Sequence, residues 1–532
     1  MTDVCIVGSG PAGALVAHRL ATRDRDVTVL EAGPRFDPDA RLERMEEAIR
    51  PGHDALSVWD MGGDRDAFSA PERFYPLNST RVKGIGGSSL HWQGMVMRLH
   101  ESDFDGSEDV AWPISYADLR PYYAAAEAEL GVAGASDNPF GPPREESHPM
   151  PAFPPSETDA LFAEACETLG IATHSVGNAR NSEQYDDRSA CVGYGTCKPV
   201  CPSGAKYTAE RHVEAAEEAG ATVLAEAPVQ RLETDASGER VTRAVYVREG
   251  EERTVEARQF VVAAGGVETP RLLLLSASEA YPDGLANSSG LVGRFFNDHL
   301  FAGMGGRLDR AVSENDIGFL TAESHQFYDD PGAETRGIPG SDADLGPIKL
   351  EFLNYAGPST TGAPSPVRIA LDGDDWGDAL LSRIRREYGS NVALGALVGQ
   401  RAREENRVTL DPERTDDHGN PVPRVEWSVG ERARRTLARA NEIQRAVMDE
   451  LGAEVTWEVG PENTGPAAHH MGTTRMGSDP EGSVVDARLR THDVANLTVA
   501  SSSVFPTGGA VNPTLTIAAL ALKVADHVDE DL

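Results

Sequence analysis

The first thirty residues alternate between short apolar runs and glycine-rich or polar breaks. Residues 3–7 (DVCIV) form a continuous apolar run, which is typical of a strand buried on both faces. A turn follows at residues 8–13 (GSGPAG), and apolar positions then recur at helical spacing through Leu20. A second apolar run, Val27 to Leu30, ends in Glu31. The pattern predicts a strand, a tight turn, an amphipathic helix and a second, parallel strand.

The glycine spacing in this turn is that of a dinucleotide-binding fingerprint. We expect Gly8 to make the tight turn, Gly10 to let the backbone approach a pyrophosphate, and Gly13 to allow close packing of helix on strand. Glu31 is placed to accept hydrogen bonds from a ribose. The flanking strand and helix make the fingerprint specific for a dinucleotide. This unit alone leaves FAD and NAD as alternatives.

Similar patterns return later in the chain. They predict a helix from Tyr207 to Ala219, a strand within residues 221–235, hairpin strands Val241 to Val247 and Arg253 to Glu256, and a buried strand before a Gly265-Gly266 turn. From residue 301 to 455 the segments become short and irregular, with loops rich in Pro, Gly and Asp, and a helix from Glu431 to Leu451 closes them.

These elements predict an α/β chain with two domains. We expect a Rossmann-like nucleotide-binding domain built from discontinuous segments, residues 1–300 and 461–532. Residues 301–460 are expected to form an α+β substrate-binding domain with an antiparallel sheet.

Charge changes the picture of partners and habitat. The chain has 85 acidic and 49 basic residues, a net charge of −36, and the lysines are few: Lys83, Lys198, Lys206, Lys349 and Lys523. An acidic surface with little lysine resembles that of proteins from salt-loving microbes, where salt screens self-repulsion. Nucleic acid and anionic membranes are therefore expected to be poor partners.

The apolar runs also bear on localisation. None reaches the roughly 20 residues of a membrane span, and the opening "MTDVCIVGSG" runs into a strand without a signal-peptide pattern. We expect a cytoplasmic protein without a membrane span, and a membrane-attached complex stays open. Cytosolic thiols are normally reduced.

Three of the five cysteines lie in "CVGYGTCKPVCP", residues 191–202. Cys191, Cys197 and Cys201 have the spacing C-x5-C-x3-C, and the closing C-x3-C-P is similar to the end of bacterial ferredoxin motifs. No fourth ligand for a tetrahedral zinc lies nearby. We expect a metal or redox role, with a Cys197 to Cys201 disulfide or three unrelated thiols as alternatives.

Five motifs in order resemble the glucose-methanol-choline (GMC) oxidoreductases, flavoenzymes that oxidise alcohols. They are the fingerprint, "GIGGSSLHWQG" (84–94, the flavin loop), "AAGGVETPRLLLLS" (263–276), "VGRFFNDH" (292–299) and the paired C-terminal stretches 469–479 and 504–528. The resemblance implies FAD as the cofactor. It does not extend to the substrate domain.

The resemblance also implies a catalytic pair. The anchor Gly472-Thr473 puts the histidine on His469, and "GGAVNPTL" puts its partner on Asn512; a slip of one residue would select His470. The implied mechanism has His469 take the hydroxyl proton while hydride passes to flavin N5, with Asn512 bonded to the same oxygen. Asn512 and Pro513 are also expected as cap and first residue of a helix.

The cofactor-binding set extends the fingerprint into the family's other motifs. It comprises Gly8, Gly10, Gly13, Glu31, Gly86, Gly87, Ser88, His91, Val229, Ser501, Asn512, Pro513 and Thr514. His91 matches a histidine that attaches FAD covalently in some relatives, and packing near the flavin is the alternative. Ser501 and Ser502 depart from the usual pattern of the family.

The motif forms are most similar to the branch of FAD-dependent glucose and gluconate dehydrogenases. In that branch three cysteines at this spacing hold a 3Fe-4S cluster, so Cys191, Cys197 and Cys201 are implied as its ligands. The substrate would be a sugar, polyol or sugar acid. The electrons would go to an acceptor protein, quinone or cytochrome, with a small subunit as a further partner. An oxygen-using oxidase and a non-catalytic electron-transfer flavoprotein remain alternatives.

Overall fold

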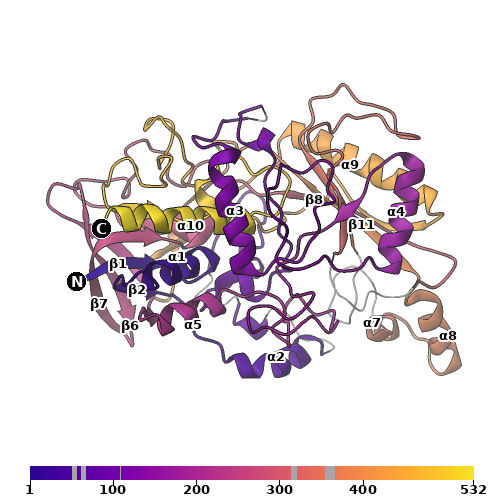
Figure 1. Ribbon diagram of the computed structural model, residues 1–532, viewed down its shortest axis with the longest axis horizontal. Helices are drawn as coiled ribbons and strands as arrows, with labels where there is room; N and C mark the ends of the chain where they lie inside the picture. Colours follow the sequence, from indigo (N-terminus) through magenta and orange to yellow (C-terminus); the bar gives the residue numbers. More distant parts are fainter. Residues whose placement is uncertain (51–56, 62–66, 108, 313–319, 354–365) are drawn as a thin grey trace.

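The computed structural model describes residues 1–50, 57–61, 67–107, 109–312, 320–353 and 366–532. Two β-sheets organise the described chain, one on each side of the molecule in the view of Figure 1. Parts of the predicted substrate domain, residues 313–319 and 354–365, lie outside the described residues.

The first sheet is the predicted Rossmann-like sheet. Its strands are β1 (Thr2–Val7), β2 (Val27–Leu30), β4 (Thr222–Leu224), β5 (Val229–Thr234), β6 (Val241–Arg248), β7 (Glu251–Val262) and β15 (Leu497–Val499). The order β4-β2-β1-β7 is parallel, and β15 also pairs in parallel with β7. β5 and β6 continue the sheet in antiparallel. The expectation of discontinuous segments is confirmed.

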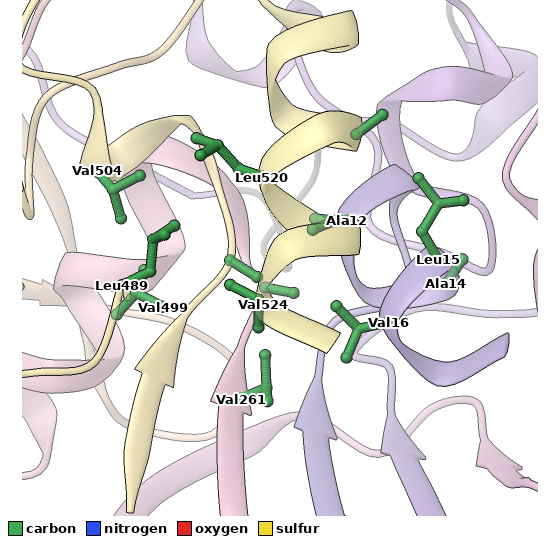
Figure 2. Close-up of a cluster of buried hydrophobic side chains, with 14 of the residues drawn as sticks. Ala12, Ala14, Leu15, Val16, Val261, Leu489, Val499, Val504, Leu520 and Val524 are labelled. Carbon is green, nitrogen blue, oxygen red and sulfur yellow. The ribbon is translucent and has the colours of Figure 1, made fainter. Parts of the chain in front are cut away.

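Three helices bury their apolar faces on this sheet and on each other. They are α1 (Pro11–Ala21), α5 (Glu210–Glu218) and α10 (Thr514–Glu530), and α3 (Tyr116–Leu130) packs on α10. Figure 2 shows Val524 of α10 above Val261 of β7, with Val16 of α1 on one side of α10 and Leu520 on the other side, toward Val504. The first and last helices of the chain therefore share one core.

The second sheet is antiparallel, as predicted. Its order is β14 (Glu454–Val459), β8 (Leu300–Arg307), β11 (Asn391–Val398), β10 (Ile348–Phe352), β9 (Ala322–Ser324) and β3 (His174–Ser175). Helix α9 (Glu431–Glu450) packs on β8 and β11, with α4 (Glu157–Leu169) beside it. A separate hairpin joins β12 (Arg407–Thr415) to β13 (Pro421–Glu426).

The remaining helices are α2 (Arg41–Ala48), α6 (Gly265–Leu275), α7 (Pro366–Leu371) and α8 (Asp378–Glu387). Within the described ranges, no helix has both the length and the apolar character that crossing a bilayer requires.

Some predicted elements differ in detail. The single strand expected within residues 221–235 is two, β4 and β5, because Glu226 has φ +52° and Pro228 follows. The hairpin strand and the buried strand expected after residue 252 are instead one strand, β7. It follows a two-residue turn in which Glu249 and Gly250 both have positive φ, as type I′ hairpins require.

The predicted helix cap at Asn512 is wrong. Helix α10 begins at Thr514, and Pro513 occupies the capping position without a side-chain bond. The Asn512 side chain is engaged elsewhere, as described below.

Candidate active site

A cavity of about 670 Å³ lies at the carboxyl ends of β1, β2 and β7. Its wall combines the turn after β1, the flavin loop, the segment after β7 and the C-terminal stretches. Most of the predicted residues line it: Gly8, Gly10, Glu31, Gly87, Ser88, His91, Val229, His469, Ser501, Asn512, Pro513 and Thr514. Gly13 and Gly86 are absent from the wall and lie behind it.

The first glycine turn is shaped by close backbone contacts. Gly8 has φ +99°, and a Cβ there would lie 2.6 Å from the carbonyl oxygen of Ala263. A Cβ on Gly13 would lie 2.0 Å from the carbonyl oxygen of Gly8. Gly13 thus supports the turn from inside α1, while Gly8 and Gly10 present backbone to the cavity.

Glu31 braces this turn from the end of β2. One carboxylate oxygen accepts from the Ser9 amide at 2.9 Å and the Ser9 hydroxyl at 2.7 Å, and the other accepts from the Gly33 amide at 3.1 Å. Burial raises the pKa of Glu31, and these hydrogen bonds oppose the shift. A carboxylate has about four lone-pair sites, so acceptors remain for a ribose at the cavity wall.

The flavin loop packs directly against the phosphate turn. Gly86 and Gly87 both have positive φ, and a Cβ on Gly87 would lie 2.9 Å from the Cα of Gly10. The Ser88 hydroxyl accepts from the Val82 amide at 3.2 Å, which holds the loop in place. The two backbones form a narrow cradle that side chains would fill.

His91 projects from this loop into the cavity wall with both ring nitrogens buried and without a partner. Burial, reinforced by Lys198 and Lys206, lowers the pKa of His91 to about 3, so the ring is neutral. An unpaired buried polar group is costly. A cofactor with polar atoms at this point would satisfy it.

His469 and Asn512 meet at the cavity. The Nε2 of His469 lies 3.3 Å from the Asn512 amide nitrogen. On its other side, the Nδ1 of His469 lies 2.8 Å from the Nδ1 of His299, and its backbone amide donates to Asp298 at 2.9 Å. Burial comes first among the causes that lower the pKa of His469 well below 6.5, followed by His299 and Lys349. The ring is therefore neutral at neutral pH.

His470, the alternative from a one-residue slip, also lines the cavity but has other partners. Its Nε2 lies 3.2 Å from the Thr80 hydroxyl, and its carbonyl accepts from Ser502 at 2.6 Å. The geometry supports His469, which is the histidine in contact with Asn512.

Two residues beside the pair were missed by sequence reasoning. Lys349 donates to the Asn512 carbonyl oxygen at 3.0 Å, and His299 contacts His469. His299 ends the "NDH" of a quoted motif, which carried no role. Lys349 had a different signal: the chain has only five lysines, and two of them, Lys206 and Lys349, are buried.

Comparison with known proteins adds the family. Residues 75–301 and 402–521 match the two sequence profiles of GMC oxidoreductases, and residues 6–50 match an NAD(P)-binding Rossmann-like domain. The chain is 33% identical to the fructose dehydrogenase large subunit of Gluconobacter japonicus, over 100% of this chain and 98% of that protein. The chain belongs to the GMC oxidoreductase family.

Further relatives of this GMC oxidoreductase agree over its whole length. It is 32% identical to 2-methyl-1,2-propanediol dehydrogenase of Mycolicibacterium austroafricanum, with 99% of this chain and 95% of that protein covered. Its fold is similar to that of pyridoxine 4-oxidase from Mesorbium loti, with a TM-score of 0.68, 21% identity, and 100% and 99% of the two chains covered.

This GMC oxidoreductase is an FAD-dependent enzyme that acts on the CH–OH group of an alcohol. The choice between FAD and NAD, which the fingerprint left open, falls to FAD. The glycine cradle, the braced Glu31 and the unpartnered nitrogens of His91 fit that cofactor.

The three clustered cysteines of the GMC oxidoreductase lie outside the cavity wall. Cys201 is a free thiol, so the Cys197 to Cys201 disulfide that the sequence left open is not formed. Burial is the main cause that raises the pKa of Cys191, and the negative potential of Cys197 and Cys201 adds to it. The three sulfurs are therefore within electrostatic reach of one another.

Two buried cations face this cysteine segment. The Arg180 guanidinium donates to the Cys197 sulfur at 3.4 Å, and its Nε and Nη2 have no hydrogen-bond partner. Lys206 donates through Nζ to the carbonyls of Cys197 at 2.7 Å, Trp92 at 2.6 Å and Leu90 at 3.1 Å. Lys206 thus ties the cysteine segment to the flavin loop on both sides of His91.

Proposed function

We propose that this chain is an FAD-dependent sugar or polyol dehydrogenase in which His469 is the general base. The observation that carries the proposal is the meeting of His469 Nε2 and the Asn512 amide at the cavity wall, 3.3 Å apart. A neutral imidazole beside an amide donor can take a hydroxyl proton while the substrate oxygen is held.

The chain's own residues would act as follows. His469 accepts the hydroxyl proton at Nε2, and Asn512 donates to the same substrate oxygen. FAD, when bound, supplies the acceptor for the hydride that leaves the carbon. Because burial keeps His469 neutral, the base is ready across neutral pH.

The cofactor would be held by residues from four segments. Gly8 and Gly10 would take the pyrophosphate, Glu31 the ribose, and the flavin loop with Gly87 and His91 the ring system. The amino end of α10, at Pro513 and Thr514, would favour negative charge on the bound flavin. Residues 301–460 would form the substrate-binding domain.

The substrate class rests on the motif forms and on the relatives. The names of the two relatives given above are those of a sugar dehydrogenase and a diol dehydrogenase. Both chemistries present a secondary or primary alcohol among neighbouring hydroxyls. We therefore propose a sugar, polyol or sugar acid.

For the electrons we propose a 3Fe-4S cluster on Cys191, Cys197 and Cys201. Arg180 is fully buried over the Phe153 ring, and its Nε and Nη2 have no hydrogen-bond partner. A buried cation is costly unless an anion compensates it. Three thiolates and the cluster they hold would provide that anion, and the cluster would supply one-electron transfer to an acceptor protein, quinone or cytochrome. One relative is named as the large subunit of its enzyme, so a small subunit is a further proposed partner.

The test uses protein purified without air. We expect flavin absorbance, about three irons per chain as the cluster formula requires, and an EPR signal from the oxidised cluster. Dye reduction with aldoses, polyols and sugar acids should identify the substrate, and His469→Ala should abolish flavin reduction. His492→Ala is the matched control, since this histidine is absent from the cavity wall and its ring contacts the Ser483 hydroxyl. Flavin without iron, together with peroxide formation, would instead indicate an oxidase.

A second measurement concerns His91. Acid precipitation of the protein separates bound from covalently attached flavin. Flavin that stays with the precipitate, and is released in His91→Ala, would indicate a covalent bond; released flavin would assign His91 to non-covalent contact.

The composition supports a proposed setting in a saline cytoplasm. With a net charge of −36, the chain repels itself at low ionic strength, and salt screens that repulsion. The unfolding temperature should therefore rise as KCl is added from low to molar concentrations.

A further inference from the structure

Each member of the proposed catalytic pair has a second partner on the side away from the other. For His469 it is His299, which lies immediately before β8, and for Asn512 it is Lys349 on β10. Both partners belong to the antiparallel-sheet half of the molecule, and both are almost completely buried. The contacts form one continuous chain from Lys349 to the carbonyl of Gly508.

At the Lys349 end of this series of contacts, only one orientation of the Asn512 amide is chemically consistent. An ammonium group donates hydrogen bonds and cannot accept them. The Asn512 atom 3.0 Å from Lys349 must therefore be the carbonyl oxygen, so the amide NH2 faces His469 Nε2 at 3.3 Å. A bond there requires a lone pair, and hence no proton, on His469 Nε2.

The Gly508 end leads to the same answer independently. A carbonyl oxygen can only accept, so His299 Nε2, 2.9 Å from the oxygen of Gly508, carries a proton. A neutral His299 then has a bare Nδ1. His469 Nδ1, 2.8 Å away, must donate to it, which again leaves His469 Nε2 without a proton.

We propose that His299 and Lys349 are positioning residues that hold His469 in the Nδ1–H form, with the Nε2 lone pair at the cavity, and fix the orientation of the Asn512 amide. The inference rests on the proposed function, since it concerns the same base. Reversal of either His469 or Asn512 alone would bring two donors or two lone pairs face to face. Only one proton arrangement satisfies all four contacts.

Lys349 is itself held in place. Its Nζ lies 2.7 Å from a Glu351 oxygen and 3.5 Å from a Glu323 oxygen, and all three side chains are buried. These carboxylates compensate the charge of the buried ammonium. Lys349 of the antiparallel sheet thus holds the Asn512 amide, which belongs to the C-terminal segment, through a charged hydrogen-bond donor.

The other charged and titratable groups around His469 all lower its pKa. His299, Lys349, His470 and Lys198 all disfavour a proton on the ring, while Asp298 accepts from the backbone amide of His469. Removing Lys349 or His299 should therefore make His469 easier to protonate.

The test compares variants of the full-length holoenzyme. His299→Leu removes both contacts, His299→Asn retains an acceptor near the position of Nδ1, and Lys349→Met removes the donor to Asn512. His492→Leu is the control. With the alcohol found by dye reduction, we expect His299→Leu to lower kcat by roughly 10²- to 10³-fold, because a fraction of the molecules would hold His469 in the wrong tautomer and positioned proton transfer contributes about 10²- to 10⁴-fold. His299→Asn should recover most of kcat, and the acid limb of kcat/KM should move to higher pH in Lys349→Met.

A spectroscopic measurement needs no substrate. Nitrogen-15 NMR of histidine-labelled holoenzyme distinguishes a protonated from a bare ring nitrogen, and His469→Gln assigns the signal. We expect His469 to be bare at Nε2 in the wild type and a mixture of tautomers in His299→Leu. Unchanged kcat, pH profile and tautomer in His299→Leu and Lys349→Met would overturn the inference while leaving His469 as the base. Full activity of His469→Ala would instead refute the proposed function.

Discussion

Lys206 connects the flavin loop to the cysteine segment, and replacing it by methionine tests that connection. The variant keeps a side chain of similar length but removes the three donors that reach Leu90, Trp92 and Cys197. A buried acceptor left without a donor costs about 1–3 kcal/mol, so three carbonyls amount to roughly 3–9 kcal/mol. Burial lowers the pKa of Lys206 to about 8, which means that the folded protein already bears a cost for this ammonium. We therefore expect a net loss near the lower end, about 3 kcal/mol.

The loss should appear in three measurements. A change of this size lowers the unfolding temperature by about 4 °C in a cofactor domain of roughly 370 residues. Because both loops relax, flavin content per protein should fall, and so should the iron content per protein. Lys523→Met is the matched control, since Lys523 is half-buried and its ammonium hydrogen-bonds His527 within its own helix. An unfolding temperature within about 1 °C of the wild type, with unchanged flavin and iron content, would refute the reasoning.

Three further results should follow from the structure. Gly13→Ala should lose FAD, measured as flavin absorbance per protein, because its Cβ would lie 2.0 Å from the Gly8 carbonyl oxygen; normal flavin content would contradict the tight packing of α1 on the turn. Arg98→Met should lower the free energy of unfolding by about 1.5–3 kcal/mol, since buried Glu127 loses its bidentate bonds to Arg98 at 2.9 and 2.8 Å but keeps those to Arg144 at 2.8 and 2.7 Å; chemical denaturation measures it, and a loss below about 1 kcal/mol would count against that pair. In the wild type, kcat/KM should stay level as pH falls through 6.5, because a base whose pKa is lowered stays unprotonated to lower pH; half the activity lost at pH 6.5 would indicate an unperturbed histidine.

The sequence predicted most of the nucleotide-binding half. The strands β1 and β2 and helix α1 follow directly from apolar runs and helical spacing, because burial on a sheet imposes those periods. The strand β3 was not predicted, since His174 and Ser175 are too short to have a period. The division of residues 221–235 depended on the backbone at Glu226, which no apolar pattern reports.

The site was predictable only in part. His469 and Asn512 came from motif spacing, and the structure brings them together from residues 43 apart in sequence. Their partners His299 and Lys349 lie at or on strands of the antiparallel sheet. Such tertiary contacts leave no periodic pattern in the sequence. One polar residue was also assigned the wrong local role. Asn512 has the sequence signature of a helix cap, but its side-chain oxygen instead accepts a hydrogen bond from the buried ammonium of Lys349.

The pairing of β7 with both β1 and β15 has a consequence for synthesis on the ribosome. The strand nearest the amino terminus cannot gain its β7 neighbour until residues 251–262 emerge, and residues 260–262 of β7 stay open on one side until residues 497–499 follow. At roughly 5–20 residues per second, translation needs about 10 to 50 seconds to add the residues between β7 and β15. During this time α1 also lacks its packing partner α10, whose Asp526 forms ion pairs with Arg19 and Arg23 of α1. The two ends of the chain lie close together on one side of Figure 1. The nascent chain therefore exposes apolar sheet for most of its synthesis, so chaperone binding and a late, nearly post-translational closure of the cofactor domain are expected.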